Sequence, residues 1–348
     1  MSEVFQIKQS KTILWIILPL LLLVLFLTNI SLGSVNIPLN DIIDILIGKT
    51  VEKDAWANII LQFRLPKAMT AILVGAGLSV SGLLMQTLFR NPLAGPFVLG
   101  ITSGASLGVA LLVLATASFG GILTFIGTSG NWLMVLAASF GAGLVLMLVL
   151  VAATRVKNSM TLLIIGLMFG SATGAIVSIL QFFSSKEQIQ SYLIWTFGSV
   201  GGLTWREINI FLPIILLGLV AAFLLKKPLN ALLLGEEYAK SMGVKIKSVR
   251  FMVIVVTSIL AGTITAFCGP IAFIGITVPH LCRMIFNTSN HKTLIIASVL
   301  MGSIIMLFCD IIAQLPGSQF VLPINAVTSL LGAPIVVWII LRKKNITT

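Results

Sequence analysis

Residues 64–108 read RLPKAMTAILVGAGLSVSGLLMQTLFRNPLAGPFVLGITSGASLG. An apolar run rich in small residues is followed by Arg90-Asn91-Pro92 and then by Pro96, and a second apolar segment rich in Gly and Ser comes after them. Helices that pack closely within lipid use small residues at their contacts. Non-helical backbone at membrane depth is tolerated only where protein or a water-filled cavity covers it. This interrupted pair of segments therefore predicts a pathway through a membrane.

The composition of the whole chain agrees with a membrane protein. Hydrophobic residues make up 58% of the 348 residues and charged residues only 9%, whereas soluble proteins carry about 25% charged residues. The charges cluster between apolar runs of membrane length, because each charge at mid-bilayer costs about 2.5–3.5 kcal/mol on insertion scales. We predict an all-α, polytopic fold in which residues 1–348 form a single transmembrane domain. The net charge of +12 then indicates topology rather than nucleic-acid binding.

Ten membrane spans are predicted. They are residues 13–32, 64–89, 93–115, 132–153, 159–182, 205–225, 250–268, 271–286, 294–313 and 323–341. An even number of spans places both termini on one side of the membrane. With the N-terminus inside, sixteen of the 22 Lys and Arg residues fall in inner segments and six in outer ones. The positive-inside rule therefore predicts cytoplasmic N- and C-termini.

Three connections between the spans have distinctive sequence patterns. Apolar residues between 37 and 47 have the spacing of a short amphipathic helix on the outer side. Residues 184–204 mix polar side chains with aromatic ones, which is typical of an interfacial belt. The inner connection, residues 226–250, is charged, is interrupted by Pro and Gly, and has a helical middle.

Cysteine chemistry and nucleotide hydrolysis find no support in the sequence. Cys268, Cys282 and Cys309 lie in or beside apolar runs without a second thiol or a His at metal-binding spacing, so we expect small buried side chains. The GKT at residues 48–50 has Ile43 where a phosphate-binding loop needs glycine. We therefore expect no enzymatic activity and no cofactor in this chain.

Four stretches carry a resemblance to a known family. They are residues 64–108, residues 235–243, GPIAFIGITVPHLCR at 269–283 and LPINAVTSLLGAPIVVWIILR at 322–342. Together they resemble the FecCD family, the membrane permeases of ABC importers for iron-siderophore complexes, haem and vitamin B12. The resemblance implies the permease fold of type II ABC importers, with ten helices per subunit, in the bacterial cytoplasmic membrane. It also implies two ATPase subunits, a substrate-binding protein, and a second copy of this chain or a paralogue. An iron chelate is the implied cargo, with cobalamin as the alternative.

The inner connection resembles the coupling motif of ABC permeases, an EAA-type sequence followed by glycine. The matching residues are Gly235, Glu236, Glu237, Ala239 and Gly243. The resemblance implies that a short helix here seats in a cleft of the ATPase. The alternative is an ordinary amphipathic connector on the cytoplasmic side.

The turn Asn91-Pro92-Leu93-Ala94 resembles the cytoplasmic gate of the family, which implies a gating role for Asn91 and Leu93. The second gate strip of the family falls on Ser159 and Met160, where Met160 replaces a small polar residue. The alternative is a helix break without a gating role, since Pro92 alone removes a donor and restricts its predecessor.

Arg64 and Lys67 open the second span on the outer side. The resemblance implies that they pair with acidic residues of the substrate-binding protein. Lys67 replaces the second Arg of that element, which keeps the charge and loses the bidentate fork. A further basic position expected before the last span is occupied by Gln314. The alternative for both cations is interfacial snorkelling.

Two further residues and one span are candidates for function. His280 lacks an acidic or Cys neighbour, so a structural role is favoured over a metal or proton site. Asp310 is the only carboxylate within an apolar span and lies near its outer end, where packing or substrate contact are both open. The Gly, Ser and Thr residues between 166 and 178 predict either a pathway lining or close helix packing.

Two other classes of protein fit the sequence less well than an ABC permease. A secondary transporter driven by H⁺ or Na⁺ needs paired ionisable residues near the midplane, and Asp310 alone is a poor candidate. A membrane enzyme needs a cluster of acidic or His side chains at one depth. The two histidines, His280 and His291, both lie near the predicted inner face and do not supply such a cluster.

Overall fold

A computed structural model describes residues 2–33, 35–49, 51, 53–115, 132–156, 159–314 and 320–344. Every regular element in these ranges is a helix. Each predicted span has a counterpart. The counterparts are α1 (Ser2–Ser31), α4 (Leu65–Leu88), α5 (Ile101–Val113), α7 (Trp132–Arg155), α8 (Ser159–Phe182), α10 (Trp205–Leu224), α13 (Ile246–Cys268), α14 (Ile274–Phe286), α15 (His291–Ala313) and α16 (Ile324–Lys344). Seven are long and apolar enough to cross a membrane, and α5, α14 and the apolar part of α16 are shorter. The all-α polytopic fold is thus confirmed.

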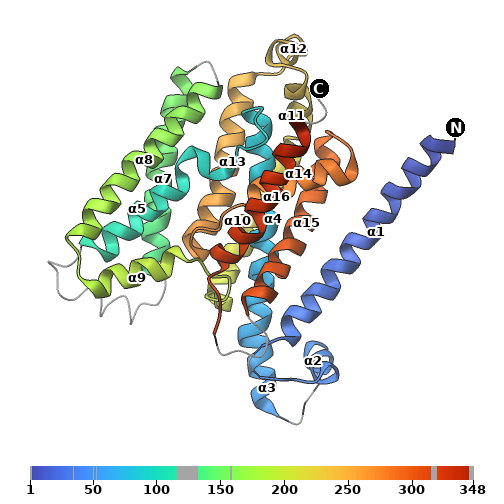
Figure 1. The fold of residues 1–348 in the computed structure, drawn as a ribbon, viewed down its shortest axis with the longest axis vertical. Helices are drawn as coiled ribbons and strands as arrows, with labels where there is room; N and C mark the ends of the chain where they lie inside the picture. Colours follow the sequence, from blue (N-terminus) through green and yellow to red (C-terminus); the bar gives the residue numbers. More distant parts are fainter. Residues whose placement is uncertain are drawn as a thin grey trace.

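Short helices lie at both ends of the bundle (Figure 1). We call the end with α11 (Lys226–Leu233) and α12 (Glu236–Ser241) the α12 end, and both chain termini lie there. The opposite end, which we call the α2 end, carries α2 (Leu39–Leu46), α3 (Asp54–Ile59) and α9 (Lys186–Thr196). The helix α2 has the predicted amphipathic character and buries Ile42 and Ile45. Lys49 follows it, and Thr50 lies outside the described residues.

Helix α4 lies at the centre of the bundle, packed against α15, α13, α14 and α10. Its small residues let neighbouring backbones approach closely. A Cβ on Gly75 would lie 2.2 Å from the carbonyl oxygen of Gly302 in α15, and one on Gly82 would lie 1.7 Å from that of Gly275 in α14. Because lipid gives helices no hydrophobic reason to associate, such close packing is what holds α4 in place.

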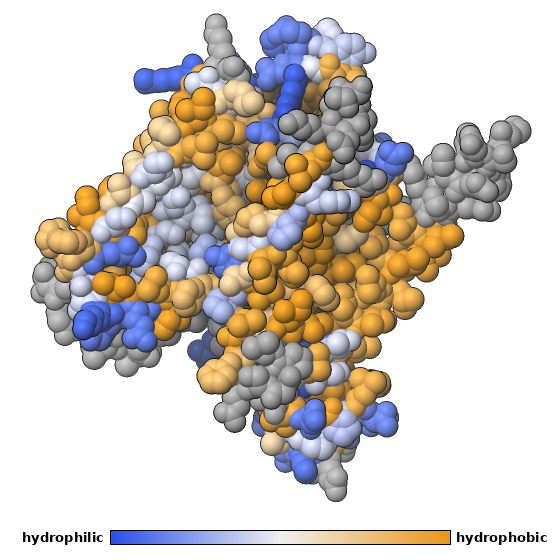
Figure 2. All heavy atoms as spheres, in the orientation of Figure 1, coloured by the Kyte–Doolittle hydropathy of each residue, from blue (hydrophilic) through white to orange (hydrophobic). Residues whose placement is uncertain are grey.

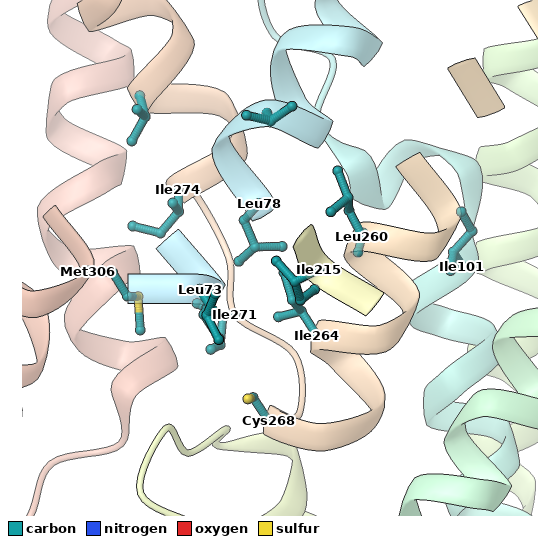
Figure 3. Close-up of a cluster of buried hydrophobic side chains, with 14 of the residues drawn as sticks. Leu73, Leu78, Ile101, Ile215, Leu260, Ile264, Cys268, Ile271, Ile274 and Met306 are labelled. Carbon is teal, nitrogen blue, oxygen red and sulfur yellow. The ribbon is translucent and has the colours of Figure 1, made fainter. Parts of the chain in front are cut away.

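Apolar side chains fill the space around these backbone contacts. Leu73 and Leu78 of α4 belong to one buried cluster with Ile215 of α10 and Ile264 of α13 (Figure 3). The three cysteines are free and buried, as predicted for small apolar side chains. On the outside, apolar side chains form a broad band and hydrophilic ones gather at the two ends (Figure 2). This distribution is that of a protein surrounded by lipid.

The element boundaries differ from the prediction in several places, and α1 starts at Ser2 rather than at residue 13. Helical backbone begins at Asp54 and continues through a π turn, η1 (Ile60–Arg64), in which Ile60 is buried. The third span begins with a 3₁₀ turn, η2 (Pro96–Leu99), and Gly100 at φ +74° starts α5. The predicted interfacial stretch 184–204 contains α9, whose start is fixed by a capping box between Ser185 and Gln188.

The close contact at Gly82 makes a testable prediction. In Gly82→Ala the new methyl group meets the backbone of α14, so we expect a loss of about 1–3 kcal/mol in stability, as for an overpacked core. Gly143→Ala in α7 is the control, because no atom lies within 4 Å of its added Cβ. Thermal unfolding of both variants in detergent measures the difference. Equal midpoints for the two variants would contradict the close packing of α4.

Candidate gating and coupling site

The turn after α4, which we call the gate turn (residues 90–95), is held by backbone and side-chain hydrogen bonds. The amide of Asn91 donates to the carbonyl of Gln86 (3.2 Å), and that of Arg90 donates to the carbonyl of Thr87 (3.3 Å). This is the Schellman pattern, whose left-handed position is usually glycine. Here Arg90 takes it, with φ +47°. Arg90 lacks the conformational freedom of glycine, so its contacts with surrounding residues must stabilise this left-handed backbone conformation.

Asn91 shapes the rest of the gate turn. Its side-chain Oδ1 accepts the amide of Leu93 (2.9 Å), and its carbonyl accepts the amide of Ala94 (3.1 Å). Leu93 is 43% exposed while Ala94 is buried. The turn thus presents the Leu93 side chain at the α12 end, and its gating role stays a prediction.

The coupling loop, residues 226–250, folds as two short helices separated by Gly235 at φ +118°. After α12 the amide of Val244 donates to the carbonyl of Ala239 (3.0 Å), and Gly243 takes φ +83°. This Schellman motif confirms that the chain turns at Gly243. Ala239 packs inward, whereas Tyr238 and Met242 are exposed at the end of the bundle.

The two glutamates of α12 have different surroundings. Glu236 Oε1 lies 3.5 Å from Nη2 of Arg250 in α13 and accepts a long hydrogen bond (3.5 Å) from the Ser159 hydroxyl at the start of α8. Glu237 points away from the bundle, with 87% of its side chain exposed, and pairs with Lys240. Glu236 therefore connects the coupling loop to the second predicted gate strip, while Glu237 is available to a partner.

An open cavity of about 850 Å³ joins the predicted coupling and gate residues. Its lining consists of Leu88, Phe89, Arg90, Ser159, Met160, Leu234, Gly235, Glu236, Glu237 and Tyr238. The structure thus brings Ser159 and Met160 to the coupling loop, although they are some 75 positions apart in the sequence. Asn91 and Leu93 lie next to Arg90 on the gate turn and outside this lining.

At the α2 end, the Arg64 side chain is directed inward. It is 9% exposed and donates to the carbonyls of Ile30 (2.8 Å), Ser31 (2.8 Å) and Val35 (2.5 Å). These carbonyls lie at and just after the end of α1, where an α-helix leaves acceptors without intrahelical donors. Arg64 therefore closes the C-terminal end of α1, and its role in docking stays a prediction.

Asp310 is the centre of a polar cluster at the same end. It is 2% exposed and, together with Lys67, lines an open pocket at this end. It forms an ion pair with Lys67 (3.1 Å) and accepts hydrogen bonds from Asn29 (2.8 Å) and Gln314 (2.9 Å). Through these contacts Asp310 joins α1, α4 and α15. Gln314 occupies the position where a basic residue was expected, and its amide contributes one of these hydrogen bonds to Asp310.

The chain is similar to proteins of known families and structures. Residues 21–342 match the FecCD transport family. The hemin transport system permease protein HmuU of Yersinia pestis is 33% identical over 93% of this chain and 95% of its own length. The vitamin B12 import system permease protein BtuC of Klebsiella pneumoniae is 34% identical over 99% of this chain and 98% of its own length. A probable iron chelatin transport system permease protein of Helicobacter pylori is 34% identical over 85% of this chain and 86% of its own length.

A solved structure, described as a metal-chelate type ABC transporter in an inward-facing conformation, has the same fold. It superposes with a TM-score of 0.80 at 29% identity and covers 93% of this chain and 97% of that one. The resemblance read from the sequence is thereby confirmed, and the ten-helix bundle is that of an ABC importer permease, in which ATP hydrolysis lies in a separate subunit. The chain belongs to the FecCD transport family.

Proposed function

We propose that this chain passes an iron chelate, a siderophore complex or haem, into the bacterial cytoplasm. ATP hydrolysis by two associated ATPase subunits drives the transport. The observation that carries the proposal is the shared cavity of the coupling loop and the second gate strip, because it gives an ATPase a direct mechanical route to the pathway. Relatives that carry hemin and iron chelatin support an iron chelate. A vitamin B12 permease of similar identity keeps cobalamin as the second candidate.

The α12 end is the cytoplasmic side in this proposal. Basic residues concentrate there, on and around the coupling loop, as the positive-inside rule requires. Tyr238, Met242 and Glu237 then form an exposed patch with apolar and acidic character, which suits insertion into a cleft of the ATPase. Closing of the ATPases around ATP would move α12, and Glu236 would pass that movement to Ser159.

A second copy of this chain, or a paralogue, would complete the pathway. The exposed face of α8 carries small residues at helical spacing: Ser171, Gly174, Ala175 and Ser178. Figure 2 shows pale, weakly polar surface on the α5 and α8 side of the molecule, unlike the apolar band elsewhere. A face of this kind suits contact with a partly hydrated cargo better than contact with lipid tails.

The experiment that tests the function is reconstitution with the companion ATPase and binding protein in proteoliposomes. We expect uptake of a ferric siderophore or haem that requires ATP and stops when the ATPase is omitted. Cobalamin uptake under the same conditions would select the second candidate. Uptake that persists without any ATPase and follows an ion gradient would contradict the proposal and favour a secondary transporter.

The two glutamates of α12 are expected to separate binding from coupling. Glu237→Ala removes an exposed charge, so we expect ATPase copurification to weaken by about two- to fivefold, the range of an exposed ion pair. Glu236→Ala removes the carboxylate that Arg250 and Ser159 contact. It should leave copurification intact and reduce uptake per ATP hydrolysed. Identical behaviour of the two variants would contradict these separate roles.

Docking of the binding protein is proposed at the α2 end, with Lys67 as the candidate cation, because its side chain is 21% exposed whereas Arg64 is buried. Lys67→Gln combined with Asp310→Asn removes the charge without leaving a buried carboxylate unpaired. We expect binding-protein affinity to fall by about fivefold at low salt and to approach that of the wild type at high salt. Lys49→Gln is the control, since Lys49 pairs with Asp44 on the same end. Equal affinities for the double variant and the control would remove Lys67 from the docking surface.

A further inference from the structure

His291 begins α15 and is fully buried, with its ring between two other elements. Nδ1 lies 2.8 Å from Oδ1 of Asn230 in α11, and Nε2 lies 2.8 Å from Oγ1 of Thr87 in α4. A coupling-loop helix and the last turn of the central helix are thus joined through one side chain. Neither the predicted gate nor the predicted coupling motif includes any of these three residues.

The hydrogen bonds at Asn230 determine how the ring is held. Its Oδ1 also accepts the backbone amide of His291 (2.8 Å), and its Nδ2 donates to Oδ1 of Asn290, the N-cap of α15 (3.3 Å). Since Oδ1 has no proton to give, Nδ1 of the ring is the donor, and in the neutral ring Nε2 is an acceptor for the Thr87 hydroxyl. The carbonyl of Leu83 in the same helix lies 2.9 Å from that hydroxyl and is the second acceptor for its single proton. Asn230 therefore ties α11 to the start of α15 through both backbone and side chain.

A second contact holds α11 to the gate turn itself. Nη2 of Arg90 donates to the carbonyl of Leu232 in α11 (3.1 Å). Arg90 is the residue in the left-handed conformation, three positions after Thr87. Both the last turn of α4 and the strained residue that opens the gate turn are therefore fastened to α11. A displacement of α11 relative to either would break one of these contacts or carry the turn with it.

We propose that His291 is the positioning residue through which the coupling loop controls the gate turn. The bridge formed by Asn230, His291 and Thr87 makes α11 and the end of α4 move as one body, while Gly235 separates that body from α12. This inference rests on the proposed ATP-driven transport. A positioning role for His291 differs from a purely structural one in what the loss of the bridge changes. It should reduce the amount of cargo imported per ATP and leave the assembly of the complex unchanged.

The test compares two Thr→Val substitutions in α4 within the full transporter in proteoliposomes. Thr87→Val removes the hydroxyl that contacts His291. Thr70→Val removes the hydroxyl of another buried threonine of α4, which donates to the carbonyl of Pro66 in its own helix (2.8 Å). We expect ATP hydrolysed per cargo molecule imported to rise at least about threefold in Thr87→Val, within the range of energetic coupling between sites. Thr70→Val should keep the wild-type ratio, and both variants should retain the ATPase subunits.

A second pair of variants tests the other half of the bridge without altering α4. Asn230→Asp keeps the oxygen that accepts both hydrogen bonds from His291 and loses only the amide donor to Asn290, whereas Asn230→Ala removes both. The number of ATP molecules hydrolysed per cargo molecule imported should stay near the wild-type value in Asn230→Asp and rise in Asn230→Ala. Equal ratios for Thr87→Val and Thr70→Val, or for the two Asn230 variants, in a wild-type complex that couples ATP to uptake would overturn this inference alone. Wild-type uptake that needs no ATP would instead overturn the proposed function.

Discussion

The contact of backbone against backbone around α4 is the constraint on which the rest of this structure depends. A membrane helix gains little from burying apolar side chains against other helices, because lipid is equally apolar. The pairs formed by Gly75 with Gly302 and by Gly82 with Gly275 bring α4, α14 and α15 closer than any side chain would permit. The central helix consequently has little freedom to tilt by itself. Movement of its end at the gate turn must therefore involve its neighbours.

Three groups of buried polar side chains lie at helix ends, where they join segments that are distant in the sequence. Arg64 closes the end of α1, Asp310 gathers Lys67, Asn29 and Gln314 at the α2 end, and His291 joins α11 to α4 at the α12 end. Leaving any one partner alone in such surroundings costs more than the contact itself contributes. Specific polar contacts thus hold the two ends of the bundle, and close backbone packing at glycines holds α4 between them.

The sequence predicted the helices well and the contacts between distant residues poorly. Spans are readable because the cost of burying charge in lipid marks them in the sequence, and Gly243 revealed the turn after α12. The helix α9 was missed although its capping box at Ser185 and Gln188 was a readable signal. The inward direction of Arg64 was not readable, because its acceptors are backbone carbonyls about thirty residues away. Asn29 and Asp310 are 281 positions apart, and no local pattern connects them.

In the proposed mechanism, nucleotide binding at the α12 end changes the gate turn. The most direct measurement is the rate at which a thiol reagent modifies Leu93→Cys in the assembled transporter, since Leu93 is exposed and the three native thiols are buried. The account predicts rates that differ by at least about fivefold between the nucleotide-free and ATP-bound complexes, the lower end of typical coupling between sites. Equal rates in a complex that imports its cargo with ATP would contradict it.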